Sequence, residues 1–136
     1  MADTLKLEIV TPGATIYSED VNMVTLPAVE GQIGIYPHHV PLMTRIVPGE
    51  IRVRKEGQDD FLAVGEGLVE ITSGRVAIVT DMAVAAKDID EAAAEEARQR
   101  AAAHLRDKLS DAEIATVNGA LTRALAQLRV KRRRRV

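Results

Sequence analysis

Cysteine and tryptophan are absent from this chain of 136 residues, which also contains only two tyrosines and one phenylalanine. Without cysteine, the chain has no disulfides, no thiolate chemistry and no zinc–sulfur sites. So few aromatic rings argue against recognition of bases or sugars by stacking. No apolar run approaches the roughly 20 residues that span a bilayer, and residues 1–4 carry no feature of a secretory signal. We therefore expect no direct insertion into a membrane and no binding of nucleic acid.

The composition is 46% hydrophobic and 28% charged, which is typical of a globular protein. The core must be built from valine, isoleucine, leucine and alanine. The net charge of −2 hides a division of the chain: residues 1–86 carry 6 basic and 12 acidic side chains, whereas residues 87–136 carry 12 basic and 8 acidic ones. This asymmetry predicts two parts that face different partners.

Up to about Thr80, apolar and polar residues alternate with period two and are interrupted by turn formers. The pattern predicts strands at residues 5–9, 21–26, 51–53, 61–64, 68–72 and 75–80. We expect Pro27 to end the second strand, Ser73-Gly74 to join the last two, and Asp59-Asp60 to lie in a solvated polar loop over residues 56–60. Short strands at this spacing favour an antiparallel sandwich or barrel over parallel βαβ units.

Residues 31–42 interrupt this rhythm with two glycines, two prolines and two histidines. Because proline donates no ladder hydrogen bond, the segment is predicted at a sheet edge or in an ordered surface loop. His38 and His39 invite a metal site, but adjacent side chains diverge and the other histidine, His104, lies in the helical part. We predict no metal site and favour a role in ordering the loop or in an interface.

Motifs of enzymes are missing: there is no Gly-x-Ser-x-Gly, no Walker sequence and no Gly-x-Gly-x-x-Gly that opens a helix. Gly65-Glu66-Gly67 lies between two predicted strands, so a turn or bulge is favoured over a phosphate-binding loop. The sequence therefore predicts no catalytic residues.

From Asp88 onward the period becomes helical, with predicted helices at residues 88–109 and 111–130. Asp88 with Glu91, and Ser110 with Glu113, each fit a capping box. The short connection predicts an antiparallel hairpin. One apolar stripe of the second helix is predicted from Ile114, Val117, Leu121, Leu125 and Leu128.

Alanine dominates the first helix, at positions 92–94, 97 and 101–103. A buried leucine contributes roughly 1.5–3 kcal/mol, whereas one methyl group contributes about 0.8 kcal/mol. The hairpin is therefore predicted to leave the β domain at modest cost.

Residues 131–135 form a basic tail that is either a solvated terminus or a binding segment for an anionic surface. Two alternative functions follow from these features. One is a free-standing β-sandwich binding module whose basic tail binds nucleic acid or an anionic membrane. The other is a small cupin-like metalloenzyme, which lacks ligands in this sequence.

Residues 26–42 read Leu-Pro-Ala-Val-Glu-Gly-Gln-Ile-Gly-Ile-Tyr-Pro-His-His-Val-Pro-Leu. This segment closely resembles the signature loop of the epsilon subunit of bacterial F-type ATP synthases. Residues 47–53, 76–81 and 86–92 resemble further segments of that family, in the expected order and across the whole chain.

The resemblance implies a mainly β plus α fold, with an N-terminal antiparallel β-sandwich in residues 1–86 and a C-terminal antiparallel two-helix hairpin in residues 87–136. It implies a non-catalytic rotor subunit in the central stalk of a proton-translocating synthase, peripheral to the cytoplasmic face of the bacterial inner membrane. The partners would be the gamma subunit, the c-ring, and the alpha and beta subunits of the catalytic head. The hairpin would inhibit ATP hydrolysis in its extended state.

The resemblance also implies three sets of site residues. A loop facing the c-ring would comprise Glu30, Gly31, Ile33, Tyr36, His38, His39, Pro41 and Leu42. Contacts to the catalytic head would come from Arg98, Arg100, Arg106, Lys108, Arg123 and Arg129. A degenerate ATP-sensing motif would comprise Ile89, Asp90, Ala93, Arg100 and Arg123.

Two positions depart from the family's pattern. Ala93 stands where the ATP-binding motif has arginine, and loss of one charge-assisted contact costs roughly 1.5–3 kcal/mol. We therefore predict weak or absent ATP binding to the hairpin and no other cofactor. His38 stands where glycine or asparagine is common.

Overall fold

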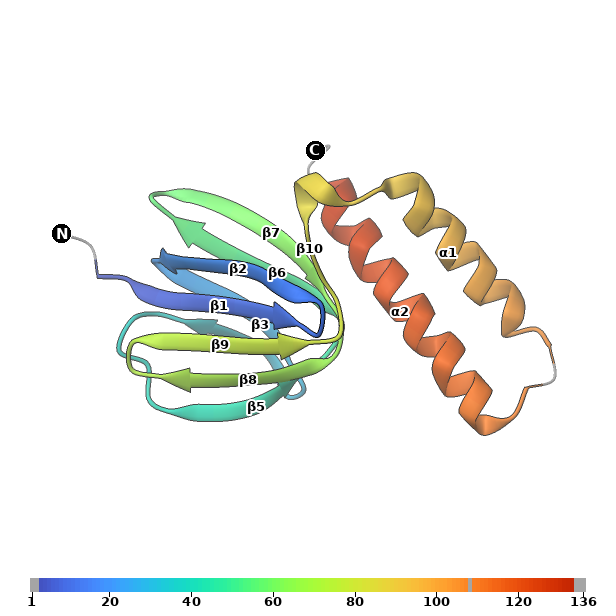
Figure 1. The fold of residues 1–136 in the computed structure, drawn as a ribbon, viewed down its shortest axis with the longest axis horizontal. Coiled ribbons are helices and arrows are strands. Elements are labelled where there is room, and N and C mark those ends of the chain that lie inside the picture. The colour runs from blue at the N-terminus through green and yellow to red at the C-terminus, as the bar shows by residue number, and fades with distance from the viewer. Residues whose placement is uncertain (1–2, 108, 134–136) are drawn as a thin grey trace.

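The computed structural model describes residues 3–107 and 109–133, which form a β-sandwich with a two-helix hairpin docked at one end (Figure 1). The strands of the sandwich are β1 (Leu5–Thr11), β2 (Ala14–Val21), β3 (Met23–Ala28), β4 (Gly31–Ile35), β5 (Leu42–Ile46), β6 (Gly49–Lys55), β7 (Gln58–Val64), β8 (Gly67–Thr72), β9 (Arg75–Thr80) and β10 (Ala83–Ala85). The predicted fold class is confirmed.

The strands follow the order β10-β7-β6-β3-β5-β8-β9-β1-β2, and β4 pairs with β3 away from this path. Neighbouring strands are antiparallel except β1 and β9, which run parallel with Ile9 opposite Ile78. The predicted strands over residues 68–72 and 75–80 form a hairpin in which Thr72 pairs with Arg75, as expected.

Alternation of inward apolar and outward polar residues builds the interior, as the burial pattern of β1 illustrates. The largest side chains that are completely buried are Leu7, Ile9, Leu26, Ile35, Ile51, Leu62, Ile71 and Ile78. Each contributes roughly 1.5–3 kcal/mol by its removal from water. Because this core cluster lies within residues 5–83, the sandwich has an interior of its own without the hairpin.

The sequence pattern does not reveal four strands, β2, β4, β5 and β10. β2 is almost entirely exposed, so it does not need an alternating apolar face. β4 contains two glycines, which disfavour strands, and β10 has only three residues. The placement of residues 31–42 at a sheet edge or in a loop is confirmed, because β4 pairs with β3 alone and Tyr36–Pro41 is a loop.

Pro27 and the Asp59-Asp60 pair lie within strands rather than at their ends, so both predictions are wrong. β3 runs through Pro27, which pairs with Gln32, to Ala28. The β6–β7 hairpin turns on two residues only, Glu56 and Gly57, at positive φ angles of 53° and 80°. A two-residue turn with both angles positive matches the twist of the strands, so β7 begins at Gln58.

Gly67 begins β8 directly after the turn at Gly65-Glu66, which confirms the turn predicted for this tripeptide. A Cβ atom at Gly67 would lie 2.0 Å from the backbone oxygen of Val79. Glycine is therefore required here for the close approach of β8 and β9.

The helical part consists of a short 3-10 turn, η1 (Ala86–Asp88), followed by α1 (Glu91–His104) and α2 (Asp111–Arg133). The Asp88–Glu91 capping box is wrong: Asp90 is the N-cap of α1, and its carboxylate accepts a hydrogen bond of 3.0 Å from the Ala93 amide. The helix begins late because Ile89 is buried in extended backbone. α1 also ends at His104, earlier than predicted.

The second capping box is confirmed. The Ser110 hydroxyl accepts from the Glu113 amide at 3.2 Å, and the Glu113 carboxylate accepts from the Ser110 amide at 3.1 Å. α2 starts where predicted and extends beyond Val130 to Arg133.

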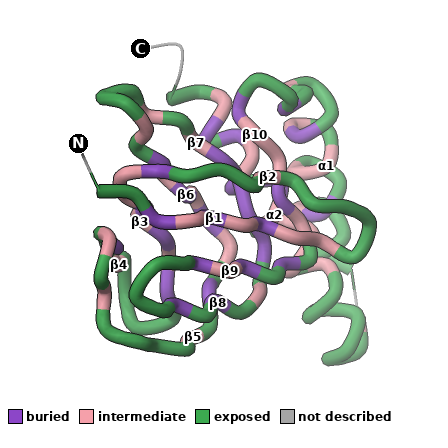
Figure 2. Tube along the Cα trace, turned by 60° about the vertical axis from the view of Figure 1, so that its left-hand side comes forward, coloured by how far each residue is buried: buried purple, intermediate pink, exposed green. Residues whose placement is uncertain are grey.

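The predicted apolar stripe of α2 is wrong, because Ile114 and Leu125 are exposed and Leu128 is its only buried member. The buried residues are instead Ala124, Ala126, Leu128 and Val130. α2 packs against two neighbours, α1 and the end of the sandwich, so its second half is covered from two sides (Figure 2). Its first half projects beyond the sandwich (Figure 1).

Candidate functional site

The hairpin meets the sandwich through a small apolar cluster, here called the hairpin seam: Ala63, Ala86, Ile89, Ala126 and Val130. Phe61, Met82 and Val84 pack around it and are partly buried. Three of its five buried members are alanines, each with about one methyl group, or about 0.8 kcal/mol, to contribute. The seam therefore contributes little free energy to docking, although the two helices of the hairpin are long.

Charged groups in the second half of α2 reinforce the seam. Arg133 Nε lies 2.7 Å from Glu50 Oε2 on β6, and its guanidinium lies 5.2 Å from the centroid of the Phe61 ring. Lys131 Nζ donates to the Ala86 carbonyl at 3.3 Å. Arg123 Nη1 approaches Asp81 Oδ2 at 3.6 Å. Two ion pairs, Arg133–Glu50 and Arg123–Asp81, thus connect the hairpin to the sandwich.

α1 and α2 are joined by a charge cluster around Arg132. Its guanidinium contacts Glu91 Oε1 and Glu95 Oε2, both at 3.1 Å. Glu95 also accepts hydrogen bonds from Arg98 and Gln99 on α1. Chiefly the Arg98 hydrogen bonds, with smaller contributions from Gln99 and Arg132, lower the pKa of Glu95 to about 2. The two helices therefore share one network of charge-assisted hydrogen bonds.

In this docked arrangement, three of the residues predicted to contact a catalytic head are paired within the chain. Arg98 pairs with Glu95 and Arg100 with Glu96, both within α1. Arg123 pairs with Asp81 of the sandwich. Arg106, after α1, and Arg129, on α2, are exposed, and Lys108 lies outside the described residues, as do Arg134 and Arg135 of the basic tail. Their contacts stay a prediction.

The degenerate ATP-sensing motif is already occupied by contacts within the chain. Ile89 is buried in the seam, and Asp90 caps α1 through the Ala93 amide. Arg100 and Arg123 are paired with Glu96 and Asp81. A nucleotide would have to compete with these partners, which agrees with weak binding but leaves it a prediction.

The residues predicted to face the c-ring are divided between the two ends of the sandwich. Glu30 lies in the β3–β4 turn at the hairpin end, Gly31 begins β4 and Ile33 lies inside it. Tyr36, His38, His39 and Pro41 lie in the loop that follows β4, and Leu42 begins β5. The length of β4 separates the two groups by about 13 Å. They therefore belong to different surfaces.

His38 occupies a backbone conformation with φ of 69°, which disfavours side chains and explains a preference for glycine or asparagine. Its amide donates to the Ser73 carbonyl of the β8–β9 turn at 2.8 Å, and Nε2 lies 3.5 Å from Asp3 Oδ2. His39 Nδ1 donates to the Val40 carbonyl at 2.6 Å. Among residues 3–107 and 109–133, no cluster of His, Asp and Glu is arranged to hold a metal ion.

At the hairpin end, the β3–β4 turn lies beside the C-terminal part of α2. A cavity of about 400 Å³ separates Gly31, Gln32 and Pro48 from Arg129 and Arg133 of the helix. Glu50, the partner of Arg133, also lines it. This surface therefore combines the sandwich and the docked hairpin.

An exposed apolar surface, which the sequence interpretation misses, lies on β5, β8 and β9. Leu68 and Val79 are paired across strands and are 54% and 60% exposed, and Met43 on β5 is 65% exposed. Met43 is a diagonal neighbour of Leu68, whose direct partner on β5 is Arg45. We call Met43, Leu68 and Val79 the outer patch. Exposed apolar surface of this kind marks protein–protein contacts.

Comparison with known families identifies both parts of the chain. The sequence profile described as "ATP synthase, Delta/Epsilon chain, beta-sandwich domain" matches residues 4–86. The profile described as "ATP synthase, Delta/Epsilon chain, long alpha-helix domain" matches residues 87–132. Together the two profiles cover almost the whole chain.

Two curated relatives illustrate the similarity. The chain is 42% identical over 128 residues to the ATP synthase epsilon chain of Halorhodospira halophila, which covers 93% of this chain and 91% of the relative. It is 44% identical over 134 residues to the ATP synthase epsilon chain of Nitrosococcus oceani, and this alignment covers 98% of this chain and 96% of the relative.

Two solved structures share the fold. A chain in the cryo-EM structure of the Euglena gracilis mitochondrial ATP synthase, OSCP/F1/c-ring, matches with a TM-score of 0.74 at 24% identity, covering 88% of this chain and 76% of that one. A chain of the Tetrahymena thermophila mitochondrial ATP synthase central stalk/c-ring matches with a TM-score of 0.63 at 13% identity, covering 97% and 96%. In the part of the chain that the structure describes, no helix is long and apolar enough to cross a membrane.

Proposed function

The chain belongs to the ATP synthase epsilon-chain family, as its sequence resemblance indicates, and we propose that it is a non-catalytic rotor subunit of the central stalk of a proton-translocating F-type synthase. It couples rotation of a c-ring to ATP synthesis in the catalytic head and restrains ATP hydrolysis through its hairpin. In that complex it lies peripherally on the cytoplasmic face of the bacterial inner membrane. It requires no cofactor of its own.

Two surfaces of the sandwich support contacts within a stalk. The outer patch offers apolar area on one face, which suits a permanent neighbour, and we assign it to the gamma subunit. Of the residues predicted to face the c-ring, we keep Glu30, in the exposed β3–β4 turn, and Gly31, the exposed first residue of β4. The loop with Tyr36 and His38 leads into β5, so we group it with the outer patch.

The small seam is the observation that carries the regulatory part of the proposal. The hairpin leaves no hole in the sandwich core when it departs, because the core cluster contains no helical residue. Its departure exposes the three alanines, Ile89 and Val130 of the seam. Such a contact can be exchanged for a contact with another subunit at modest cost.

The docked and the extended hairpin also differ in the partners of two arginines. In the docked state Arg123 and Arg133 are neutralised by Asp81 and Glu50 of the sandwich. When the hairpin extends, both guanidinium groups lose these partners and become available to acidic loops of the beta subunits. Arg98 and Arg100 keep their partners, because these lie on α1 itself. The sandwich carboxylates and the catalytic head therefore compete for the same arginines.

Hydrolysis by a catalytic head containing gamma tests this proposal. Its rate is measured alone, with the full chain, and with a truncated variant comprising residues 1–86, which retains the whole sandwich core. We expect the full chain to lower the rate and the truncated variant to bind without lowering it. Equal rates with the two variants, at saturating binding, would refute the inhibitory role of the hairpin and leave a coupling role for the sandwich.

A second arm uses the full chain with Glu50→Gln, which removes the partner of Arg133 without removing the hairpin. If docking and inhibition compete, this variant inhibits hydrolysis more strongly than the native chain. Glu19→Gln is the matched control, because Glu19 pairs with Lys55 inside the sandwich and neither residue belongs to the predicted contacts with the head.

A further inference from the structure

The docked chain does not start α1 where the sequence of this segment favours a helix start. Asp88 and Glu91 have the spacing of a capping box, in which the capping side chain accepts from the amide three residues later and the acidic side chain returns the bond. Asp90, the cap that the structure uses, has Ala93 at the third position, so only the first of these two bonds is possible. Local preference therefore favours a helix that starts two residues earlier.

Packing of α2 overrides this local preference. Ile89 lies in extended backbone, with φ of −77° and ψ of 124°, and is 4% exposed in the hairpin seam together with Ala126 and Val130. Lys131 of α2 donates to the Ala86 carbonyl at 3.3 Å, and the Ile89 amide donates to the same oxygen at 3.3 Å. α2 therefore holds both the side chain and the backbone of the link that precedes α1.

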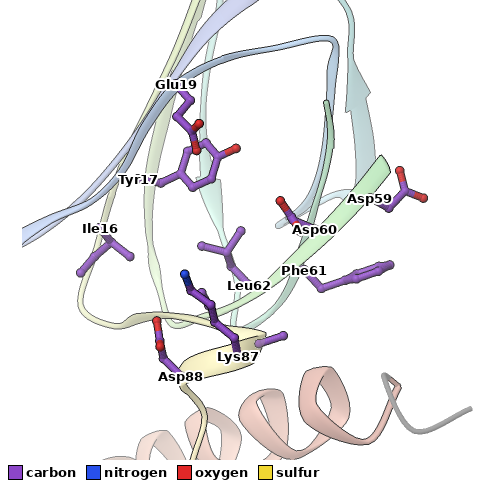
Figure 3. A pocket seen from close by; sticks show the side chains of 11 residues that line it. Ile16, Tyr17, Glu19, Asp59, Asp60, Phe61, Leu62, Lys87 and Asp88 are labelled. Carbon is purple, nitrogen blue, oxygen red and sulfur yellow. The ribbon is translucent and has the colours of Figure 1, made fainter. Parts of the chain in front are cut away.

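Asp88 has no partner in the docked chain. Its side chain is exposed and forms no hydrogen bond or ion pair within the described residues. It lies at a cavity of about 330 Å³ between β2, β7 and η1, which Tyr17 also lines (Figure 3). Because the backbone at residues 89 and 90 is extended, the Asp88 carboxylate is not placed to accept from the Glu91 amide. The cap that the sequence favours is therefore present but unused.

We propose that Ile89 couples docking of the hairpin to the length of α1. While α2 is docked, the helix starts at Glu91, after the cap Asp90. When α2 is released, Ile89 loses its place in the seam, and the helix lengthens to start at Ile89, after the cap Asp88. The inference rests on the proposed release of the hairpin but not on whether the released hairpin inhibits hydrolysis.

The longer helix changes how the hairpin is joined to the sandwich. Asp88 then accepts from the Glu91 amide, and Asp90 and Glu91 both lie in the first turn, where negative charge is favourable. Two residues pass from extended to helical backbone, which shortens the link by about 4 Å. Only Ala86 and Lys87 then remain between β10 and the cap. The released hairpin is therefore joined by a short link that restricts its direction.

Two alanine variants of the full chain test the proposal, because their effects on docking should have opposite signs. Asp88→Ala removes the cap of the released state alone, so amide exchange of residues 124–130 should become about fivefold slower, the typical effect of an N-cap on a helix equilibrium. Asp90→Ala removes the cap of the docked state, so the same amides should exchange faster. Unchanged exchange in Asp88→Ala would overturn the proposal, because a helix that starts after Asp90 in both states gives the Asp88 side chain no role.

Two further variants separate capping from charge. Asparagine caps a helix as well as aspartate does, so Asp88→Asn should exchange like the native chain. Asp20→Ala removes a negative charge from an exposed position on β2, outside the link, and is the matched control for Asp88→Ala. Slowing of equal size in Asp88→Asn or in Asp20→Ala would show that net charge governs docking and would contradict the assignment.

The backbone at residue 89 is measured directly in a full chain whose hairpin is released. Ala126→Asp and Val130→Asp together place two carboxylates in the seam, so the hairpin should undock while the sandwich core persists. The amide shift of Ala63, the seam residue on β7, reports release, and the Cα chemical shift of Ile89 reports the start of the helix. We expect the Ile89 shift to move from the extended to the helical range.

The proposed release and the proposed coupling fail on different residues. A native Ala63 shift in the doubly substituted chain would refute release of the hairpin and, with it, the coupling. A changed Ala63 shift with Ile89 still extended, or with α1 unfolded, would overturn the coupling alone. Adding Asp88→Ala to the released chain should reduce the helical shift of Ile89, and an undiminished shift would contradict capping by Asp88.

Discussion

The sandwich and the docked hairpin are built from similar fractions of apolar residues but are held in different ways. Among the described residues, the sandwich cluster has 18 buried members, of which two are alanines. The hairpin seam has five, of which three are alanines. The sandwich buries large aliphatic side chains on both of its inner faces, whereas the hairpin relies on small side chains and on arginine–carboxylate pairs at the edge of the seam.

This difference separates a unit that must persist from a unit that can move. Large buried side chains couple many strands, so loss of one weakens the entire sandwich. A seam of alanines supports close approach of α2 and β7 but yields little free energy, and the ion pairs beside it respond to salt and to competing charges. We therefore expect unfolding of the sandwich and undocking of the hairpin to have separate free energies.

The largest expected effect is in the sandwich core. Ile51→Ala should lower the free energy of unfolding by about 3–4 kcal/mol, through lost transfer energy and a cavity. The loss should be the same in the full chain and in residues 1–86, because Ile51 contacts the sandwich core and not the seam. Urea unfolding followed by tyrosine fluorescence measures it, since Tyr17 and Tyr36 both lie in the sandwich.

The matched change in the seam is Val130→Ala, which removes two methyl groups from a fully buried position. It should cost about 1–2 kcal/mol and appear as faster hydrogen exchange in α2, with the urea midpoint of the sandwich unchanged. A single cooperative transition that shifts equally in both variants would abolish the distinction between the two regions.

The next variant is expected to stabilise the hairpin rather than to weaken it. Gly119 lies in the middle of α2, and a Cβ there would meet only the end of the flexible Arg123 side chain, at 3.3 Å from Nη1. Gly119→Ala should stabilise the helix by about 1 kcal/mol, because glycine costs that much in a helix interior. The midpoint of the helical circular dichroism signal should rise.

Gly74→Ala is the control for this variant, since the β8–β9 turn leaves open space at that position. It should change neither the helical signal nor the sandwich. If Gly119→Ala lowered the helical midpoint, the glycine would be needed for packing against α1 or the sandwich, and the hairpin would be more rigid than its seam indicates.

The sequence predicts the elements whose pattern comes from local rules. The alternation of Leu5, Leu7 and Ile9 defines β1, and Ser110 with Glu113 defines the start of α2, because a period and a cap depend on neighbouring residues alone. The cap of α1 could not be chosen in this way. Asp88 and Asp90 are both acidic residues before a helix, and the tertiary burial of Ile89 between them decides for Asp90.

The candidate site was less accessible to sequence reasoning, since it depends on which segments meet in space. Gly31 and Gly34 hide β4, so Glu30 and His38 are expected on one loop although a strand separates them. Leu68 and Val79 follow the same alternation whether they face the core or the solvent, so the outer patch needs the sheet register. The cavity at Tyr17 joins β2, β7 and η1, which no local pattern connects.

A smaller effect is expected at the ion pair between Arg133 and Glu50. Glu50→Gln should weaken docking of the hairpin by about 0.5–1 kcal/mol, a modest value because the Arg133 side chain is half exposed. Hydrogen exchange of residues 124–133 should become faster and less dependent on salt than in the native chain. Glu96→Gln should leave exchange in α2 unchanged, and an equal effect of both variants would show that net charge, rather than this contact, governs docking.

The smallest effect concerns pH and distinguishes the pairing of α1 with α2 from the packing of the sandwich. Glu95 has a pKa of about 2 in the folded chain, below its ordinary value of 4.5, chiefly because of Arg98. A lowered folded pKa means that its contribution is complete above pH 4.5 and is lost as the pH falls toward 2. Acid should therefore loosen the Arg132 contacts to α1 in this window, and amide exchange in both helices, corrected for its intrinsic pH dependence, should measure it.

Glu95→Gln should remove this part of the pH dependence while the fold persists. Because Asp59 on β7 also has a lowered pKa, owing to Arg54 and Arg52, the sandwich weakens in acid too, and Glu95→Gln should leave that component in place. A variant whose helices respond to acid as the native chain does would show that Glu95 does not hold α1 and α2 together.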